Sequence, residues 1–302
     1  MIHFPPYLKK GSTIGMMCPA GYMPLEKAQT CIDTLHNWGY HVVTGKTLGG
    51  DSNNYFSAPD EVRLKELQQM LDDDAIDAIL FGRGGYGTGR IIDQLSFKKF
   101  RKHPKWLIGF SDITLLHHHL INKYKIAGLH APMAAAFNSA EGAPYIQMLK
   151  QVLNGKKISC TTQPHAYNLT GKATGILTGG NLSMICHASG SASEIKTRDR
   201  ILFLEDVGEY LYNIDRMMYH LKRSGKLSGI KGLILGGFTD LKDTERAFGQ
   251  QIDDILHHFT RNMNVPVCFH FPVSHGTENM PLKIGGTYQL HITEKQVTLR
   301  EK

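Results

Sequence analysis

The chain contains a short apolar run, Ala75-Ile76-Asp77-Ala78-Ile79-Leu80-Phe81, that leads directly into the glycine-rich turn Gly82-Arg83-Gly84-Gly85-Tyr86-Gly87. A second apolar run, Trp106-Leu107-Ile108, leads through Gly109-Phe110-Ser111-Asp112 into a segment with helical periodicity. Short apolar runs bounded by turn residues are typical of strands that are buried on both faces of a parallel sheet. The two runs therefore predict strands of one parallel sheet, each followed by a tight turn.

The same alternation of strands and helices extends along the N-terminal half. Apolar periodicity predicts, in order, a strand at 13–17, a helix at 24–38, a strand at 41–44, a helix after 57, a helix at 113–124 and a strand near 127. Ser57 with Asp60 three residues later predicts a capping box at the start of the second of these helices. Alternating strands and helices predict an α/β fold, with a parallel sheet covered on both faces.

The second half of the chain has a different pattern. The alternation weakens between 138 and 168, and strands and helices then mix before apolar residues alternate between 288 and 299, which predicts an antiparallel hairpin. We therefore expect an N-terminal domain at 1–140, a connection at 141–164 and a C-terminal domain at 165–302.

Composition narrows the classes of protein to consider. The 34 Lys and Arg residues against 27 Asp and Glu residues give a net charge of +7, which suits an anionic substrate. The basic run at 98–105 lies between two structural elements and matches no nucleic-acid-binding motif, so we expect no nucleic-acid partner. Without a long apolar window or a signal-peptide pattern, we expect a cytoplasmic protein that does not cross a membrane. The five scattered cysteines are expected to be reduced, mostly buried thiols.

The turn at 82–87 fits three interpretations. It matches the dinucleotide-binding pattern G-x-G-x-x-G, although it follows the third strand and the next strand ends in 109–111 rather than in an acidic residue. It is also typical of a tight turn whose glycines adopt positive φ angles. Finally, its backbone N–H groups, with that of Gly85 as candidate, can supply an oxyanion-hole donor, while Arg83 and Tyr86 become candidate substrate-binding residues.

Ser111 lies where the second apolar run turns into a helix. This placement resembles the nucleophile elbow of hydrolases, in which the backbone N–H of the next residue, here Asp112, helps to bind an oxyanion. The sequence G-x-S-D departs from the elbow pattern G-x-S-x-G. Taken alone, Ser111 and Asp112 are also good helix-capping residues.

Five separated motifs closely resemble those of the LD-carboxypeptidase family of serine peptidases, in family order and over nearly the whole chain. They are Gly82-Arg83-Gly84-Gly85-Tyr86-Gly87, Gly109-Phe110-Ser111-Asp112, Gly179-Gly180-Asn181-Leu182-Ser183, Leu204-Glu205-Asp206-Val207-Gly208-Glu209 and Ile214-Asp215-Arg216. The resemblance implies a flavodoxin-like parallel-sheet N-terminal domain, a β-rich α+β C-terminal domain, and a Ser-Glu-His triad divided between them.

The resemblance places the triad on Ser111, Glu205 and His275. The chemistry agrees, because a serine nucleophile needs a base and a histidine base needs a carboxylate to fix its tautomer. Taken alone, Glu205 is equally an ion-pair partner at a strand end, and His275 an exposed loop histidine. The family commonly has glycine where this chain has Ser274, and frequently tyrosine where it has Phe110.

The activity that the resemblance implies is the release of terminal D-alanine from murein tetrapeptides in cell-wall recycling, by a homodimer. A sibling branch of the family hydrolyses peptidyl-nucleotide antibiotics and gives self-immunity with the same triad, so both substrates stay open. The alternative from another class is a nucleotide-binding oxidoreductase or a binding module that uses the turn at 82–87.

No metal or other cofactor is expected. His117, His118 and His119 look like ligands, but consecutive helical positions point about 100° apart and cannot converge on one ion. The remaining histidines show neither H-E-x-x-H nor another ligand spacing. Glu205 and Asp206 do not form a glycosidase pair, because adjacent strand residues face opposite ways.

Overall fold

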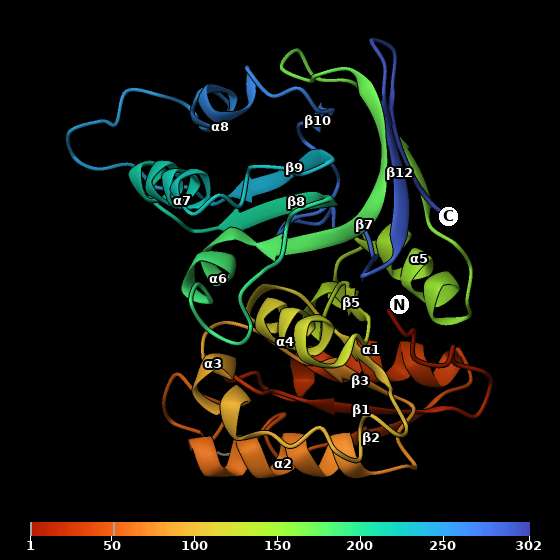
Figure 1. Ribbon diagram of the computed structural model, residues 1–302. Helices are drawn as coiled ribbons and strands as arrows, with labels where there is room; N and C mark the ends of the chain where they lie inside the picture. The colour runs from red at the N-terminus through yellow and green to blue at the C-terminus, as the bar shows by residue number, and fades with distance from the viewer. Residues whose placement is uncertain (1, 51) are drawn as a thin grey trace. The chain divides into compact units, whose positions relative to one another are not determined.

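The computed structural model describes residues 2–50 and 52–302, which form two compact units (Figure 1). The N-terminal unit contains the described residues up to Lys156 together with Met280–Lys283. The C-terminal unit contains Lys157–Asn279 and Ile284–Lys302. Part of the expected connection at 141–164 is helical, since α5 (Ala143–Leu153) lies in it and belongs to the N-terminal unit.

The N-terminal unit is built on a six-stranded sheet. Its strands are β1 (Thr13–Met17), β2 (His41–Thr44), β3 (Ala78–Phe81), β4 (Trp106–Ile108), β5 (Gly128–His130) and β11 (Leu282–Ile284). Their order is β2-β1-β3-β4-β5-β11, and the first five strands pair in parallel. The order 2-1-3-4-5 is that of a flavodoxin-like sheet, so the predicted α/β fold is confirmed.

Burial explains why the inner strands read as continuous apolar runs. Every residue of β3, β4 and β5 is buried, whereas β2 at the sheet edge is largely exposed. Strands buried on both faces require helices on both faces. The longer helices of this unit, besides α5, are α1 (Glu26–Asn37), α2 (Asp60–Asp72) and α4 (Thr114–Tyr124).

The predicted capping box at the start of α2 is wrong. Pro59 occupies the N-cap position and makes no side-chain capping bond. The hydroxyl of Ser57 instead donates to the backbone carbonyl of Cys18 at 2.6 Å and ties the approach to α2 to the loop after β1. The Ser57 side chain therefore makes a tertiary hydrogen bond instead of the helix cap that the local pattern predicted.

The C-terminal unit is built on a seven-stranded mixed sheet. Its strands are β6 (Ser159–Thr162), β7 (Gly171–Asn181), β8 (Arg200–Val207), β9 (Gly232–Thr239), β10 (Val267–Cys268), β12 (Thr287–Ile292) and β13 (Val297–Glu301), in the order β10-β9-β8-β7-β12-β13-β6. The first half of the long, bent β7 pairs antiparallel with β12 and its second half pairs parallel with β8 (Figure 1). The antiparallel pairing of β12 with β13 confirms the predicted C-terminal hairpin.

Three helices cover the parallel part of this sheet: α6 (Leu182–His187), α7 (Leu211–Arg223) and α8 (Ile252–Thr260). Along α7 the buried residues Leu211, Ile214, Met218 and Leu221 recur at helical spacing, and they share one core with Leu204 of β8. This packing holds β8 in place, and Glu205 lies near the carboxyl end of that strand. Among the helices of the described residues, none has the length and hydropathy of a membrane span.

Candidate active site

Ser111 occupies a sharp turn between β4 and α4. It is the first residue of a 3-10 turn, η2 (Ser111–Ile113), and its φ angle is +61°. A positive φ on a residue other than glycine costs about 1–3 kcal/mol and is found preferentially at functional sites. The turn therefore has the strand-to-helix geometry expected of a nucleophile elbow.

The glycine-rich turn packs directly against this elbow. A Cβ atom built on Gly84 would lie 3.1 Å from the Ser111 Cβ and 3.3 Å from the Asp112 nitrogen, so only glycine fits here without displacement. Gly85 and Gly87 have φ angles of +95° and +151°. Gly84 thus allows the backbone to approach Ser111 closely, and Gly85 and Gly87 allow the tight turn.

Asp112 does not cap the helix that follows it. The N-cap positions of η2 and α4 are held by Phe110 and Ile113, and these two described residues make no side-chain capping bond. The fully buried Asp112 carboxylate instead accepts a hydrogen bond from the backbone nitrogen of Thr88 at 2.8 Å. Thr88 begins α3 (Thr88–Ile91) directly after the glycine turn, so Asp112 ties the elbow to that turn.

In the C-terminal unit, Glu205 and His275 form a short hydrogen bond. Glu205 lies near the end of β8 with its side chain fully buried, and its Oε2 is 2.6 Å from Nδ1 of His275, whose side chain is 14% exposed. A carboxylate on Nδ1 holds the proton on that nitrogen and leaves Nε2 as the basic atom. The two residues therefore have the geometry of an oriented histidine base.

A pair of glycines positions the loop that carries His275. Opposite Glu205, β9 contains an extra residue, because Leu204 pairs with Leu235 whereas Asp206 pairs with Phe238. The intervening glycines, 236 and 237, let the loop approach: a Cβ atom on Gly236 would lie 2.1 Å from the carbonyl oxygen of Val273. The backbone nitrogen of Gly237 donates to the same oxygen at 2.9 Å.

Two family models match this chain. The model of the LD-carboxypeptidase N-terminal domain matches residues 14–131, and that of the LD-carboxypeptidase C-terminal domain matches residues 174–290. The chain belongs to the LD-carboxypeptidase family. These matches confirm the family assignment made from the motifs. They also confirm the general activity, that of a carboxypeptidase.

Known proteins and solved structures are similar to this chain over nearly its whole length. A probable murein peptide carboxypeptidase of Bacillus subtilis (strain 168) is 31% identical over 299 residues, which cover 98% of this chain and 93% of that protein. The crystal structure of muramoyltetrapeptide carboxypeptidase from Oxalobacter formigenes is 26% identical, with a TM-score of 0.86 over 96% of this chain and 98% of the other. Microcin C7 self-immunity protein MccF, in complex with aspartyl sulfamoyl adenosine, shares the fold, with a TM-score of 0.88, 19% identity and coverage of 100% and 99%.

The electrostatics around His275 favour its protonated form. Burial opposes protonation, but the charge of Glu205 and the hydrogen bond to it, with smaller contributions from Asp206 and Asp240, raise the pKa of His275 above its usual value. Asp206 accepts hydrogen bonds from Asn181 at 2.7 Å and from the backbone nitrogen of Ser183 at 2.9 Å. Burial raises the pKa of Asp206 to about 6 despite these bonds.

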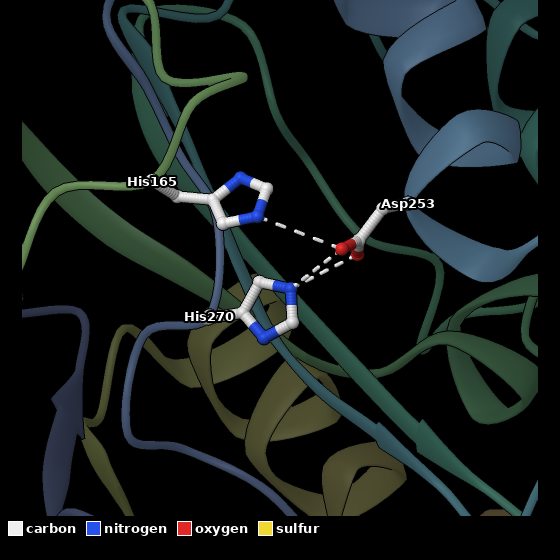
Figure 2. Close-up of side chains that lie close together, drawn as sticks. All are labelled: His165, Asp253 and His270. Atoms are coloured by element: carbon white, nitrogen blue, oxygen red, sulfur yellow. Dashed lines mark hydrogen bonds and ion pairs between the residues drawn. The ribbon is translucent and has the colours of Figure 1, made fainter.

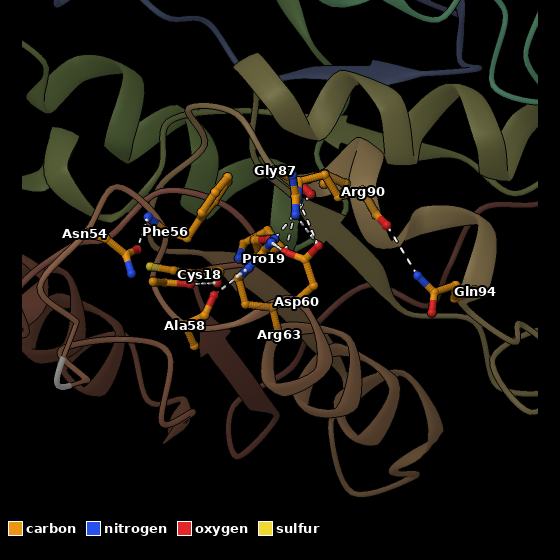
Figure 3. A network of polar contacts seen from close by, with 12 residues as sticks. Cys18, Pro19, Asn54, Phe56, Ala58, Asp60, Arg63, Gly87, Arg90 and Gln94 are labelled. Atoms are coloured by element: carbon orange, nitrogen blue, oxygen red, sulfur yellow. Dashed lines mark hydrogen bonds and ion pairs between the residues drawn. The ribbon is translucent and has the colours of Figure 1, made fainter.

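Sequence reasoning missed Arg63, which braces the glycine turn (Figure 3). Its fully buried guanidinium donates to the carbonyl oxygens of Pro19, in the loop after β1, and of Gly87, the latter at 3.2 Å. It also forms an ion pair with Asp60, which binds Arg90 at 2.8 Å. The signal that identifies Arg63 is its position, because it shares the buried face of α2 with Leu67 and Met70.

The two candidate substrate-binding residues are exposed in the N-terminal unit. Arg83 donates from Nη1 to the carbonyl oxygen of Tyr22 at 2.8 Å, so it makes at least one bracing contact with backbone. A guanidinium carries five N–H donors, and one such bond is compatible with carboxylate recognition by the others. The Tyr86 side chain is 44% exposed, with its ring 6.0 Å from that of Phe56.

The structure also accounts for the two departures from the family pattern. The Ser274 hydroxyl donates to the carbonyl oxygen of Glu278 at 2.8 Å and accepts from the backbone nitrogen of Gly276 at 3.0 Å, so it closes the turn around His275. The Phe110 ring packs 5.6 Å from that of His130.

The three consecutive histidines lie in α4 and are all buried. Nε2 of His117 is 3.1 Å from the carbonyl oxygen of Leu107, and burial lowers the pKa of His117 to about 4. His117 therefore ties α4 to β4 as a neutral packing residue.

Proposed function

We propose that this protein is a serine carboxypeptidase with Ser111 as nucleophile, His275 as general base and Glu205 as the residue that orients the base. The observation that carries the proposal is the partly buried hydrogen bond of 2.6 Å between Glu205 and His275 in a chain of the LD-carboxypeptidase family. The positive φ of Ser111 supports it from the N-terminal unit. All the proposed catalytic groups are protein atoms, so no metal or cofactor takes part.

In the proposed reaction, Oγ of Ser111 attacks the carbonyl carbon that precedes the terminal residue, and Nε2 of His275 takes the proton of the hydroxyl. The backbone N–H groups of Asp112 and Gly85 hold the oxyanion of the tetrahedral intermediate. The imidazolium then protonates the amine of the departing residue. Water, activated by the same histidine, hydrolyses the ester on Ser111 and restores the enzyme.

We further propose murein tetrapeptides as substrates and D-alanine as the released residue, in cell-wall recycling. The names of the relatives support this choice, since one is a probable murein peptide carboxypeptidase and another a muramoyltetrapeptide carboxypeptidase. Because the chain shares its fold with a microcin self-immunity protein, peptidyl-nucleotides are the alternative substrate that the experiment must test.

The deciding experiment incubates the protein with purified murein tripeptide, tetrapeptide and pentapeptide and follows the products by mass spectrometry. We expect only the tetrapeptide to lose its terminal residue, and the Ser111→Ala variant to leave all three intact. A parallel incubation uses a peptidyl-nucleotide, and another titrates the protein with NAD and NADP. Cleavage of the peptidyl-nucleotide alone would replace the proposed substrate, and stoichiometric NAD binding would favour the nucleotide-binding alternative.

Recognition of the chain end is proposed for Arg83, whose planar fork can pair with a terminal carboxylate through two hydrogen bonds. If Arg83 reads the carboxylate, amidating the substrate terminus should cripple the wild type but barely change an already weak Arg83→Ala variant. Equal proportional losses in the two proteins would assign chain-end recognition to another residue.

We also propose that the protein works in the cytoplasm as a homodimer, as the family resemblance implies. Light scattering of the purified chain measures the assembly state, and cell fractionation measures the compartment. A monomer at working concentration would contradict the proposed homodimer. Activity confined to an extracellular fraction would contradict the proposed cytoplasmic location.

A further inference from the structure

We propose that the C-terminal unit holds one divalent transition-metal ion of the Zn²⁺ type between His165, Asp253 and His270. The three side chains come from the segment before β7, the first turn of α8 and the residues after β10, and they point toward one another (Figure 2). One ligand atom from each lies within 4.8 Å of the other two. Among the described residues, no other group of three or more His, Cys, Asp or Glu side chains brings its ligand atoms close enough together to hold one metal ion. None of the three belongs to the proposed triad.

The distances approach those of a coordination sphere. Nε2 of His270 is 2.9 Å from Oδ2 of Asp253, and Nε2 of His165 is 3.6 Å from the same oxygen. Zinc binds histidine nitrogen and carboxylate oxygen at about 2.0–2.2 Å, so two tetrahedral ligand atoms lie about 3.3 Å apart. Both distances differ from that value by only a few tenths of an ångström, which small rotations of the half-buried His165 ring and the exposed His270 ring can accommodate.

The surroundings hold the ligands in place. The His165 ring stacks on that of Phe269 at 5.5 Å and lies 4.7 Å from the ring of His270. His270 has a φ angle of +53°, a left-handed conformation that is uncommon outside glycine. These ring contacts limit the rotation of the two imidazoles. Nδ1 of His165 lies 3.3 Å from the backbone nitrogen of Tyr167, and this hydrogen bond must give way when Nε2 binds the metal, because Nδ1 then carries the proton.

Asp253 is not the carboxylate that caps its helix. At the start of α8, the capping box is formed by Gln251 and Asp254, so the adjacent Asp254 satisfies the backbone of the helix end. Asp253 instead meets the two histidines and lines a cavity of about 190 Å³ with His270 and Phe269. Two imidazoles and one carboxylate are the ligand set of open Zn²⁺ and Fe²⁺ sites, in which water fills the remaining positions.

The proposal is tested on the full chain after treatment with a chelator and exhaustive dialysis. Titration with Zn²⁺ in a calorimeter should show one equivalent bound per chain, and Co²⁺ should develop the visible absorption bands of an imidazole-coordinated ion. His270→Ala and Asp253→Asn should each weaken Zn²⁺ binding by at least the roughly 10- to 100-fold that losing a supporting contact costs. Zn²⁺ should raise the melting temperature of the wild type but not of either variant.

The matched control is His291→Ala, which removes an exposed histidine of β12 in the same unit and should leave Zn²⁺ affinity unchanged. Circular dichroism and the melting temperature without metal establish that each variant folds. Failure of the wild type to bind a stoichiometric ion, or unaltered affinity in both ligand variants, would overturn the proposal and leave a hydrogen-bonded His-Asp cluster.

Discussion

Replacing Glu205 by glutamine tests how His275 is made basic. The substitution keeps the size of the side chain but removes the charge 2.6 Å from Nδ1. Opposite charges whose centres are about 4 Å apart interact by about 4 kcal/mol at an effective dielectric constant of 20. The imidazolium that forms in the transition state loses this interaction, which corresponds to a rate loss of about 10³-fold. A glutamine amide that presents its NH₂ group to Nδ1 also favours the wrong tautomer and brings the loss toward about 10⁴-fold.

The pH profile gives a second readout of the same change. His275 acts as a base only when neutral, and its pKa is raised in the wild type, so kcat/KM should rise with pH through a value above the usual histidine pKa. Without the Glu205 charge the two largest interactions that raise the pKa of His275 are lost, while burial still lowers this pKa. The acid limb of the Glu205→Gln profile should therefore move to lower pH even as the plateau falls.

The assay is release of the terminal residue from murein tetrapeptide, followed by mass spectrometry from pH 5 to pH 9. The matched control is Glu194→Gln, which removes a partly exposed ion pair of the same unit, 2.6 Å from Lys226. Partly exposed ion pairs contribute about 0–1 kcal/mol to stability, so Glu194→Gln should change neither the rate of hydrolysis nor its pH profile. A Glu205→Gln enzyme with the wild-type rate and an unmoved acid limb would refute the role assigned to Glu205.

Four further predictions concern the remaining parts of the site. Ser111→Ala should lower turnover by about 10⁴- to 10⁶-fold with an unchanged circular dichroism spectrum, and near-normal hydrolysis would exclude it as nucleophile. Gly84→Ala places a Cβ 3.1 Å from that of Ser111 and should lower kcat by roughly 10- to 100-fold. The control Gly190→Ala has open space around its Cβ, and although its φ of +76° costs about 1–2 kcal/mol of stability, it should leave kcat unchanged. Because burial raises the pKa of Asp206 from 3.8 to about 6, the folded state keeps a proton that the unfolded chain releases, so urea unfolding should show about 3 kcal/mol of stability lost between about pH 4 and pH 6 in the wild type but not in Asp206→Asn. Turnover should survive a chelator, since the proposed catalytic groups are protein atoms, and activity lost to EDTA and restored by Zn²⁺ would contradict the mechanism.

Local sequence patterns predicted the strands more accurately than the ends of the helices. The strands at 13–17 and 41–44 were placed at their observed bounds, because each is a short run bounded by turn residues. The strand expected at 75–81 begins only at Ala78, since the backbone nitrogen of Ile76 turns back to the carbonyl oxygen of Asp73. That turn depends on hydrogen bonds that apolar periodicity does not encode.

The candidate site needed more than local patterns. Glu205 and His275 are 70 positions apart, so no periodicity or spacing joins them, and the family resemblance supplied the pairing. Asp253 and His270, 17 positions apart, were missed because neither lies in a ligand motif, and only the packing of α8 beside the residues after β10 brings them together. The apolar face of α2 indicates that Arg63 is buried. The sequence does not indicate its partners, the carbonyl oxygens of two loops.

Ser274, where the family commonly has glycine, depends on a glycine opposite it and makes hydrogen bonds that a glycine could not make. A side chain at this position needs space, and Gly237 provides it, since a Cβ atom on Gly237 would lie 2.6 Å from the Cβ of Ser274. The serine then uses its hydroxyl to bond Glu278 and Gly276 across the turn. These bonds restrict the backbone, which a glycine would leave freer. His275, the next residue, keeps a bond of 2.6 Å to Glu205. We therefore interpret Ser274 as a brace for the turn that carries His275, and the serine fits there because position 237 has no side chain.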